Sequence, residues 1–172
     1  MVSTDKPLKS ELILAELTLR QRTKEVVDVE EELVKIMIFV CGGGRYAFYG
    51  SDIREILSGC EIFWVPGLPE YLPGLINVRG DIESVIDVRH FLGMEKAGLG
   101  SGLIAMAVRE DFRLGVMIDA IDDVVDIPKN AIKPPLSTLN GSARDLVAGE
   151  IEYLDQIITL LAIEKLAARI AL

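Results

Sequence analysis

The sequence has few of the residues that bind metals or act as nucleophiles in enzymes. It contains two cysteines, Cys41 and Cys60, and one histidine, His90. These residues lie 19 and 30 positions apart and fit none of the close spacings that are typical of zinc sites. We therefore expect no metal and no cofactor, and we interpret the cysteines as two separate buried thiols.

Long hydrophobic runs and an excess of positive charge are also absent. The longest uncharged run, residues 97–108, has twelve residues and three glycines, whereas a membrane-spanning helix needs about 20 apolar residues. No cationic stretch followed by an apolar one opens the sequence, so no secretion signal is expected. Lys and Arg number 18 against 27 Asp and Glu, a net charge of −9 that disfavours nucleic acids and anionic membranes. The composition predicts a cytoplasmic protein without direct membrane insertion.

The 172 residues divide into a polar leading segment and a patterned remainder. In residues 10–22, Leu12, Ala15 and Leu19 recur at three- and four-residue steps, which predicts an amphipathic helix. Residues 25–32 hold five carboxylates, a run typical of a solvated connector. We therefore expect residues 1–32 to form an N-terminal helix and an acidic linker, and residues 33–172 to form the folded domain.

From residue 33 onward, short apolar stretches alternate with glycine and proline, as in β-strands. Residues 42–44 are three glycines and predict a hairpin turn, because the residues after them do not complete a phosphate-binding loop. Residues 51–57 fit either a helical turn or a strand. Further strands are predicted at residues 34–41, 46–49, 103–108, 113–118, 121–127, 146–154 and 156–162, followed by a helix at residues 163–171.

The most regular stretch is residues 76–88, where even positions are mostly apolar and odd positions mostly polar. This period of two predicts one half-buried strand, or two collinear strands interrupted at Gly80. Arg79, Asp81 and Glu83 then lie on its outward, solvated face. Residues 88–92 are expected to form a helical turn that Asp87 caps.

The apolar pattern occurs twice. A shift of 75 positions aligns the apolar residues of 76–91 with those of 151–166, and a shift of 68 aligns Ile53 and Ile56 with Ile121 and Val124. Two matches in the same order predict a duplicated architecture. We expect two small, similar and mostly antiparallel barrels packed on each other.

Four stretches in order resemble the CheW-like family, whose members couple chemoreceptors to the histidine kinase CheA. Residues 72–80 (LPGLINVRG) followed by 85–89 (VIDVR) are similar to the family's signature. Residues 44–48 (GRYAF), 53–56 (IREI) and 114–116 (LGV) with Asp119 resemble its other elements. The resemblance implies a mainly β fold of two interlocked five-stranded SH3-like barrels, to which we add the N-terminal and C-terminal helices. The chain departs from the family pattern at Glu83, where an apolar residue is usual, and at Ser84, where proline is usual.

The resemblance also implies a function without catalysis. A CheW-like adaptor has two kinds of partner, a CheA-like histidine kinase and the cytoplasmic tip of methyl-accepting chemoreceptors. A coupling protein of twitching motility or of another chemosensory pathway fits the same residues. A different class, a small cofactor-free enzyme that uses Cys60 or His90, is kept as an alternative.

The predicted partner-binding site centres on Arg79, which matches the arginine of the family's binding surface. A guanidinium suits this role because its five donors can hold carboxylates and carbonyls together. The alternative is a solvated arginine or one that bridges to Asp81 or Glu83. Residues 110–126, with six carboxylates and one arginine, are either a solvated surface or a patch that steers a basic partner. The proposed partner-binding set is Gly74, Asn77, Arg79, Gly80, Asp81 and Glu83.

Deletion of residues 1–30 is predicted to leave folding intact, because the acidic run separates the amphipathic helix from the patterned domain. The truncated protein should unfold in one cooperative transition, with a melting midpoint within a few degrees of that of the full chain. Differential scanning calorimetry of both proteins tests this. A molten or insoluble truncated chain would show instead that the helix completes the core.

Overall fold

A computed structural model describes residues 13–18, 31–96, 98, 102–110, 112–136 and 141–170. The chain divides into two compact units, Met1–Glu32 and Leu33–Leu172. In the first unit, residues 13–18 are helical and expose the apolar side chains of Ile13, Leu14 and Leu17. The rest of the predicted helix, residues 10–12 and 19–22, and residues 23–30 lie outside the described residues. Within the described residues, no helix is long and apolar enough to cross a membrane.

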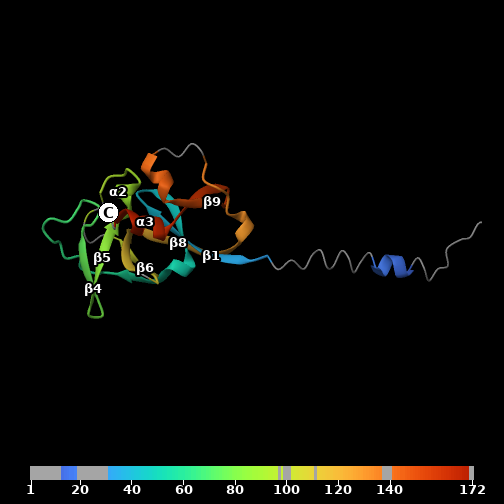
Figure 1. Cartoon of the computed structure of the whole chain (residues 1–172), viewed down its shortest axis with the longest axis horizontal. Helices are drawn as coiled ribbons and strands as arrows, with labels where there is room; N and C mark the ends of the chain where they lie inside the picture. Colours follow the sequence, from blue (N-terminus) through green and yellow to red (C-terminus); the bar gives the residue numbers. More distant parts are fainter. Residues whose placement is uncertain are drawn as a thin grey trace, which may run out of the picture. The chain divides into compact units, whose positions relative to one another are not determined.

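The second unit consists of two five-stranded sheets (Figure 1). The first sheet, barrel 1, has the order β8-β1-β2-β10-β9 and is built from β1 (Leu33–Cys41), β2 (Gly44–Tyr49), β8 (Ala120–Pro128), β9 (Val147–Tyr153) and β10 (Gln156–Leu161). The second sheet, barrel 2, has the order β3-β6-β7-β5-β4 and is built from β3 (Ile53–Ser58), β4 (Gly74–Val78), β5 (Asp81–Asp87), β6 (Leu103–Arg109) and β7 (Phe112–Ile118). The remaining elements are the helices α2 (Val88–Phe91) and α3 (Ile163–Ile170) and the 3₁₀ turns η1 (Gly50–Asp52), η2 (Lys129–Ala131) and η3 (Gly141–Leu146).

The two barrels are interlocked, as predicted. The order of elements β1–β2–β3 recurs about 68 residues later as β6–β7–β8, and β4–β5–α2 recurs about 75 residues later as β9–β10–α3. Each barrel combines the first two strands of one repeat with the last three of the other. The exchange is completed by two parallel pairings, β2 with β10 and β7 with β5. Figure 1 shows the result, with the earliest strand (blue) and the latest strands (red) in the same sheet.

Residues 74–87 form an antiparallel hairpin, which corrects the prediction of one strand or two collinear strands. Arg79 and Gly80 form its two-residue turn, with φ of 54° and 98°. The side chain of Asn77 accepts a hydrogen bond from the backbone N–H of Gly80 at 2.8 Å. Two positive φ values in succession match the turn to the right-handed twist of the strands, so the chain reverses at this point.

The turn also changes which residues face the barrel interior. Ile76 pairs with Glu83 and Asn77 pairs with Ile82, so the inward face passes from even positions in β4 to odd positions in β5. Glu83 is therefore 9% exposed while Ile82 is 63% exposed. The alternation across residues 76–88 therefore spans two strands, and the buried positions are even in the first and odd in the second. The prediction that Glu83 lies on a solvated face is wrong.

Among the residues that the structure describes, the buried apolar side chains form three clusters. One lies within barrel 1 and includes Ile36, Ile38, Ile151 and Ile158. A second lies within barrel 2 and includes Ile76, Val85, Ile104 and Met106. The largest joins both barrels to α3, and its members include Phe39, Phe48, Ile86, Val116, Leu161 and Leu166. The interior between the barrels is therefore as much a core as the interior of each barrel.

The C-terminal helix belongs to this shared core. Ile163 and Leu166 are fully buried and Ile170 packs against the same cluster, so one face of the predicted helix packs into the core. Between β10 and α3, the N–H of Ala162 donates a hydrogen bond of 2.8 Å to the carbonyl of Leu146 and fixes the start of the helix.

Leu166→Ala should lower the free energy of unfolding by roughly 2–4 kcal/mol, because it removes a fully buried side chain and leaves a cavity. Urea denaturation of the two proteins measures the change. A loss below about 0.5 kcal/mol, the range of ordinary surface substitutions, would place α3 outside the core.

Candidate functional site

The β4–β5 hairpin carries all six predicted partner-binding residues, and the extended loop before β4 holds its base. Phe63 in this loop and Leu75 exchange two backbone hydrogen bonds of 2.7 and 2.9 Å. A Cβ at Gly74 would lie 2.3 Å from the carbonyl oxygen of Phe63. Gly74 is thus required by the close approach of two backbone segments, and its contribution to the site is structural.

Arg79 stands at the hairpin tip, where its side chain is 75% exposed. Its two terminal nitrogens donate to the two carboxylate oxygens of Glu55 on β3, at 3.0 and 2.7 Å. This bidentate pair joins β3, one edge strand of barrel 2, to the turn that follows β4, the other edge strand. The hydrogen bond from Arg79 lowers the pKa of Glu55 from its ordinary value. The predicted alternative partners, Asp81 and Glu83, do not form this bridge with Arg79.

Asp81 and Glu83 are held by Arg113 of β7 instead. Arg113 Nε lies 2.9 Å from Glu83 Oε1, and Nη1 lies 3.4 Å from Asp81 Oδ2. The side chain of Asp81 is 68% exposed and that of Glu83 only 11%. The hairpin therefore has two separate ion-pair groups, Arg79 with Glu55 and Arg113 with the two carboxylates of β5. Glu55 and Arg113 are not among the predicted site residues, because neither lies near Arg79 in the chain.

The equivalent β9–β10 hairpin of barrel 1 has a different surface on a similar backbone. Its turn residues Leu154 and Asp155 have φ of 48° and 59°, and Leu154 and Ile157 are 70% and 65% exposed. Arg45 of β2 donates to Gln156 at 2.7 Å, as Arg113 contacts Asp81 in barrel 2. The first turn position is therefore a cation, Arg79, in one hairpin and an apolar residue, Leu154, in the other.

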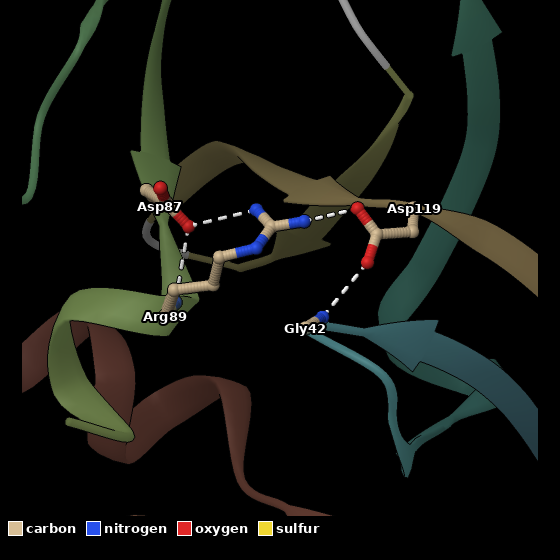
Figure 2. Close-up of polar contacts among 4 residues, drawn as sticks. All are labelled: Gly42, Asp87, Arg89 and Asp119. Carbon is tan, nitrogen blue, oxygen red and sulfur yellow. Dashed lines mark hydrogen bonds and ion pairs between the residues drawn. The ribbon is translucent and has the colours of Figure 1, made fainter. Parts of the chain in front are cut away.

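A second polar cluster lies between the barrels and is centred on Arg89, which is 4% exposed. Figure 2 shows its guanidinium lying between Asp87 and Asp119. Nη1 lies 3.1 Å from Asp87 Oδ1, and Nη2 forms an ion pair with Asp119. The other oxygen of Asp119 accepts a hydrogen bond from the N–H of Gly42 at 2.7 Å. The cluster thus connects the end of β5 in barrel 2 to the β1–β2 turn of barrel 1.

Asp87 has a second role, which the sequence predicted. Its side chain accepts from the N–H of Arg89 at 3.0 Å and caps α2. The Cys41 thiol lies in the same electrostatic environment: burial raises its pKa to about 11, although the charge of Arg89 acts in the opposite direction. Cys41 is therefore a buried thiol that stays protonated at neutral pH.

The comparisons with known proteins agree with this geometry. The family model described as "CheW-like domain" matches residues 35–171, almost the whole second unit. The chain belongs to the CheW-like domain family. It is 24% identical to the "Chemotaxis protein CheW" of Treponema pallidum (strain Nichols), over 80% of this chain and 84% of that protein. The CheW of Helicobacter pylori (strain ATCC 700392 / 26695) is 26% identical, over 79% and 82%.

A solved CheW structure has the same fold. The scaffolding protein TtCheW from Thermoanaerobacter tengcongensis superimposes with a TM-score of 0.70 and 27% identity, covering 77% of this chain and 90% of that chain. The predicted CheW-like fold of two five-stranded barrels is therefore confirmed. The names of the relatives also agree with the prediction of a chemotaxis adaptor.

The residues of the enzymatic alternative have packing contacts in the CheW-like fold. The ring of His90 lies 5.7 Å from that of Tyr71 and 5.4 Å from that of Phe91. Cys60 borders a cavity of about 20 Å³ beside Leu57 and Met117. Among the residues that the structure describes, no group of three or more His, Cys, Asp or Glu side chains is placed to hold a metal ion.

Several carboxylates of the acidic stretch 110–126 are paired within the protein. Asp122 lies 3.1 Å from Arg45, Asp126 lies 2.9 Å from Lys35, and Asp119 pairs with Arg89. Asp123 accepts a hydrogen bond from the hydroxyl of Tyr153, and Asp111 lies outside the described residues. These contacts favour the interpretation of a solvated structural surface over that of a steering patch.

Arg89→Met should lower the free energy of unfolding by about 3–5 kcal/mol, because it leaves the buried carboxylate of Asp87 without its cation. Urea denaturation measures the effect. The control is Lys35→Met, which breaks an ion pair whose side chains are 57% and 52% exposed and should cost less than about 1 kcal/mol. Equal effects of the two substitutions would show that the Arg89 cluster contributes no more than a surface pair.

Proposed function

We propose that the protein is a non-catalytic adaptor that couples chemoreceptors to a CheA-like histidine kinase in a chemotaxis-type pathway. The observation that carries the proposal is membership of the CheW-like family over residues 35–171. The similar proteins are named as chemotaxis proteins and as a scaffolding protein. The proposed partners are the kinase and the cytoplasmic tip of methyl-accepting chemoreceptors.

Two features of the fold support an adaptor with more than one partner. The exchange of strands joins the barrels through a shared core, so surfaces on the two barrels keep a constant relation to each other. The hairpin tips of the barrels then differ in chemistry, with Arg79 on one and Leu154 at the equivalent turn position of the other. A rigid body with distinct surfaces can hold unlike proteins in one arrangement.

Arg79 is the residue that we propose for direct partner contact. Its two hydrogen bonds to Glu55 use two of its five N–H donors. The turn formed with Gly80 and closed by the Asn77 side chain fixes the position of the Arg79 backbone. Arginine at such a preorganised, exposed tip loses little freedom when it binds a carboxylate or a carbonyl.

Arg79→Glu should weaken binding to one or both partners by at least about 30-fold, because it removes charge-assisted hydrogen bonds and adds repulsion. Isothermal titration calorimetry with a CheA-like kinase and with a receptor cytoplasmic fragment, measured separately, identifies the partner that Arg79 contacts. The melting midpoint should change little, because the Arg79 side chain is largely solvated.

Two control variants separate a lost contact from a released hairpin. Glu55→Gln weakens the ion pair that joins β3 to the hairpin but keeps Arg79, so it should reduce affinity much less than Arg79→Glu. Leu154→Glu adds a carboxylate to the equivalent tip of barrel 1 and should leave the Arg79-dependent partner bound. Retention of both affinities by Arg79→Glu would contradict the assigned role.

A further inference from the structure

Glu83 occupies a position that is a core position in the other repeat. A shift of 75 residues aligns Glu83 with Ile158, which is fully buried inside barrel 1. Glu83 is buried to nearly the same degree. A carboxylate at such a position must be paired with a cation, because its desolvation is otherwise uncompensated. Arg113, whose Nε lies 2.9 Å from Glu83 Oε1, supplies this charge.

The same guanidinium reaches a second carboxylate on the strand that follows the Arg79 turn. Arg113 Nη1 lies 3.4 Å from Asp81 Oδ2. Asp81 and Glu83 follow Arg79 by two and four residues, so they are local competitors for its guanidinium. Arg79 nevertheless pairs with Glu55 on β3 and keeps 75% of its side chain exposed.

We propose that Arg113 is a positioning residue for Arg79: by holding Asp81 and Glu83, it leaves Arg79 paired with Glu55 and exposed at the hairpin tip. The inference rests on the proposed function in so far as Arg79 is the group that contacts a partner. It adds that the orientation of Arg79 depends on a residue of β7, far from the tip in sequence.

Electrostatics favour this division of the charges. The hairpin and its neighbours bring three carboxylates, Glu55, Asp81 and Glu83, close to the guanidinium groups of Arg79 and Arg113. The hydrogen bond from Arg79 is the largest cause of the lowered pKa of Glu55, and the charge of Arg113 acts in the same direction, so both guanidinium groups act on this carboxylate. Without Arg113, the two carboxylates on β5 lack this cation and compete with Glu55 for the guanidinium of Arg79.

Barrel 1 offers a matched control at the equivalent position. Arg45 precedes Arg113 by 68 residues and contacts Gln156 at 2.7 Å and Asp122 at 3.1 Å. The turn beside it carries Leu154 where barrel 2 has Arg79. Arg45→Met therefore removes the same kind of side chain from the same place in the repeat without a contact to the Arg79 hairpin.

The experiment has two readouts on the full-length protein. The first is the ¹⁵N-edited NMR signal of the Arg79 side-chain Nε–Hε group in the free protein, with and without Glu55→Gln. The second is the affinity for whichever partner Arg79→Glu weakens. The variants are Arg113→Met, Arg113→Lys, the control Arg45→Met, and a triple variant that combines Arg113→Met with Asp81→Asn and Glu83→Gln.

Arg113→Met should shift the Arg79 signal and make that signal insensitive to Glu55→Gln. It should also weaken partner binding about fivefold or more, which is the size of coupling expected between residues of one ion-pair network. The triple variant should restore both readouts, because it removes the competing carboxylates as well as their cation. Arg113→Lys, which keeps the charge, should restore them in large part. Arg45→Met should leave both readouts unchanged.

An unchanged Arg79 signal in Arg113→Met would overturn the proposal. So would a triple variant that restores neither readout, because Arg113 would then act through packing and not through the carboxylates. A wild-type protein that binds neither partner would overturn the proposed function alone. In that case the NMR signal of Arg79 still confirms or overturns its placement by Arg113.

Discussion

The position of the two barrels relative to each other depends on the ion pairs of the buried Arg89 guanidinium. One of its partners, Asp87, lies at the end of β5 in barrel 2. The other, Asp119, lies where the chain crosses from β7 in barrel 2 to β8 in barrel 1, and it also binds the turn between β1 and β2. A buried cation must stay paired with carboxylates. In the folded protein, Arg89 therefore holds together the end of β5, the crossover from β7 to β8 and the β1–β2 turn.

The other crossover between the barrels is anchored by a similar pair. The buried carboxylate of Asp52 in η1, between β2 and β3, lies 3.7 Å from Arg109 Nε, and Arg109 Nη1 lies 2.7 Å from Glu164 on α3. Burial raises the pKa of Asp52, while Arg109 acts against this rise. Both crossovers thus combine an aspartate with an arginine from another element. Together with the shared apolar core, they make the pair of barrels one body, which is what an adaptor requires to set the distance between its partners.

Duplication has left the two barrels with similar backbones and different tips. The β4–β5 and β9–β10 hairpins share a two-residue turn with positive φ, yet one carries Arg79 and a buried Glu83 where the other carries Leu154 and a buried Ile158. The burial of Glu83 requires Arg113, and this places a charged network beneath the tip of barrel 2. Equivalent surfaces of the two barrels therefore differ chemically within one small protein.

The sequence by itself indicated most of the strands, the two repeats and the family. These features depend on apolar periodicity, glycine punctuation and short motifs, all of which are local in the chain. It also predicted the cap at Asp87, because a cap needs only a few neighbouring residues.

Tertiary structure alone decided how the predicted site is arranged. Alternation of apolar and polar residues looks the same in one long strand and in a hairpin whose turn changes the phase at Arg79 and Gly80. The partners of the charged residues, Glu55 for Arg79 and Arg113 for Glu83, come from β3 and β7, which are distant in sequence. Ion pairs form between whatever groups the closing of a barrel brings together, and that meeting is a property of the folded chain and not of any local pattern.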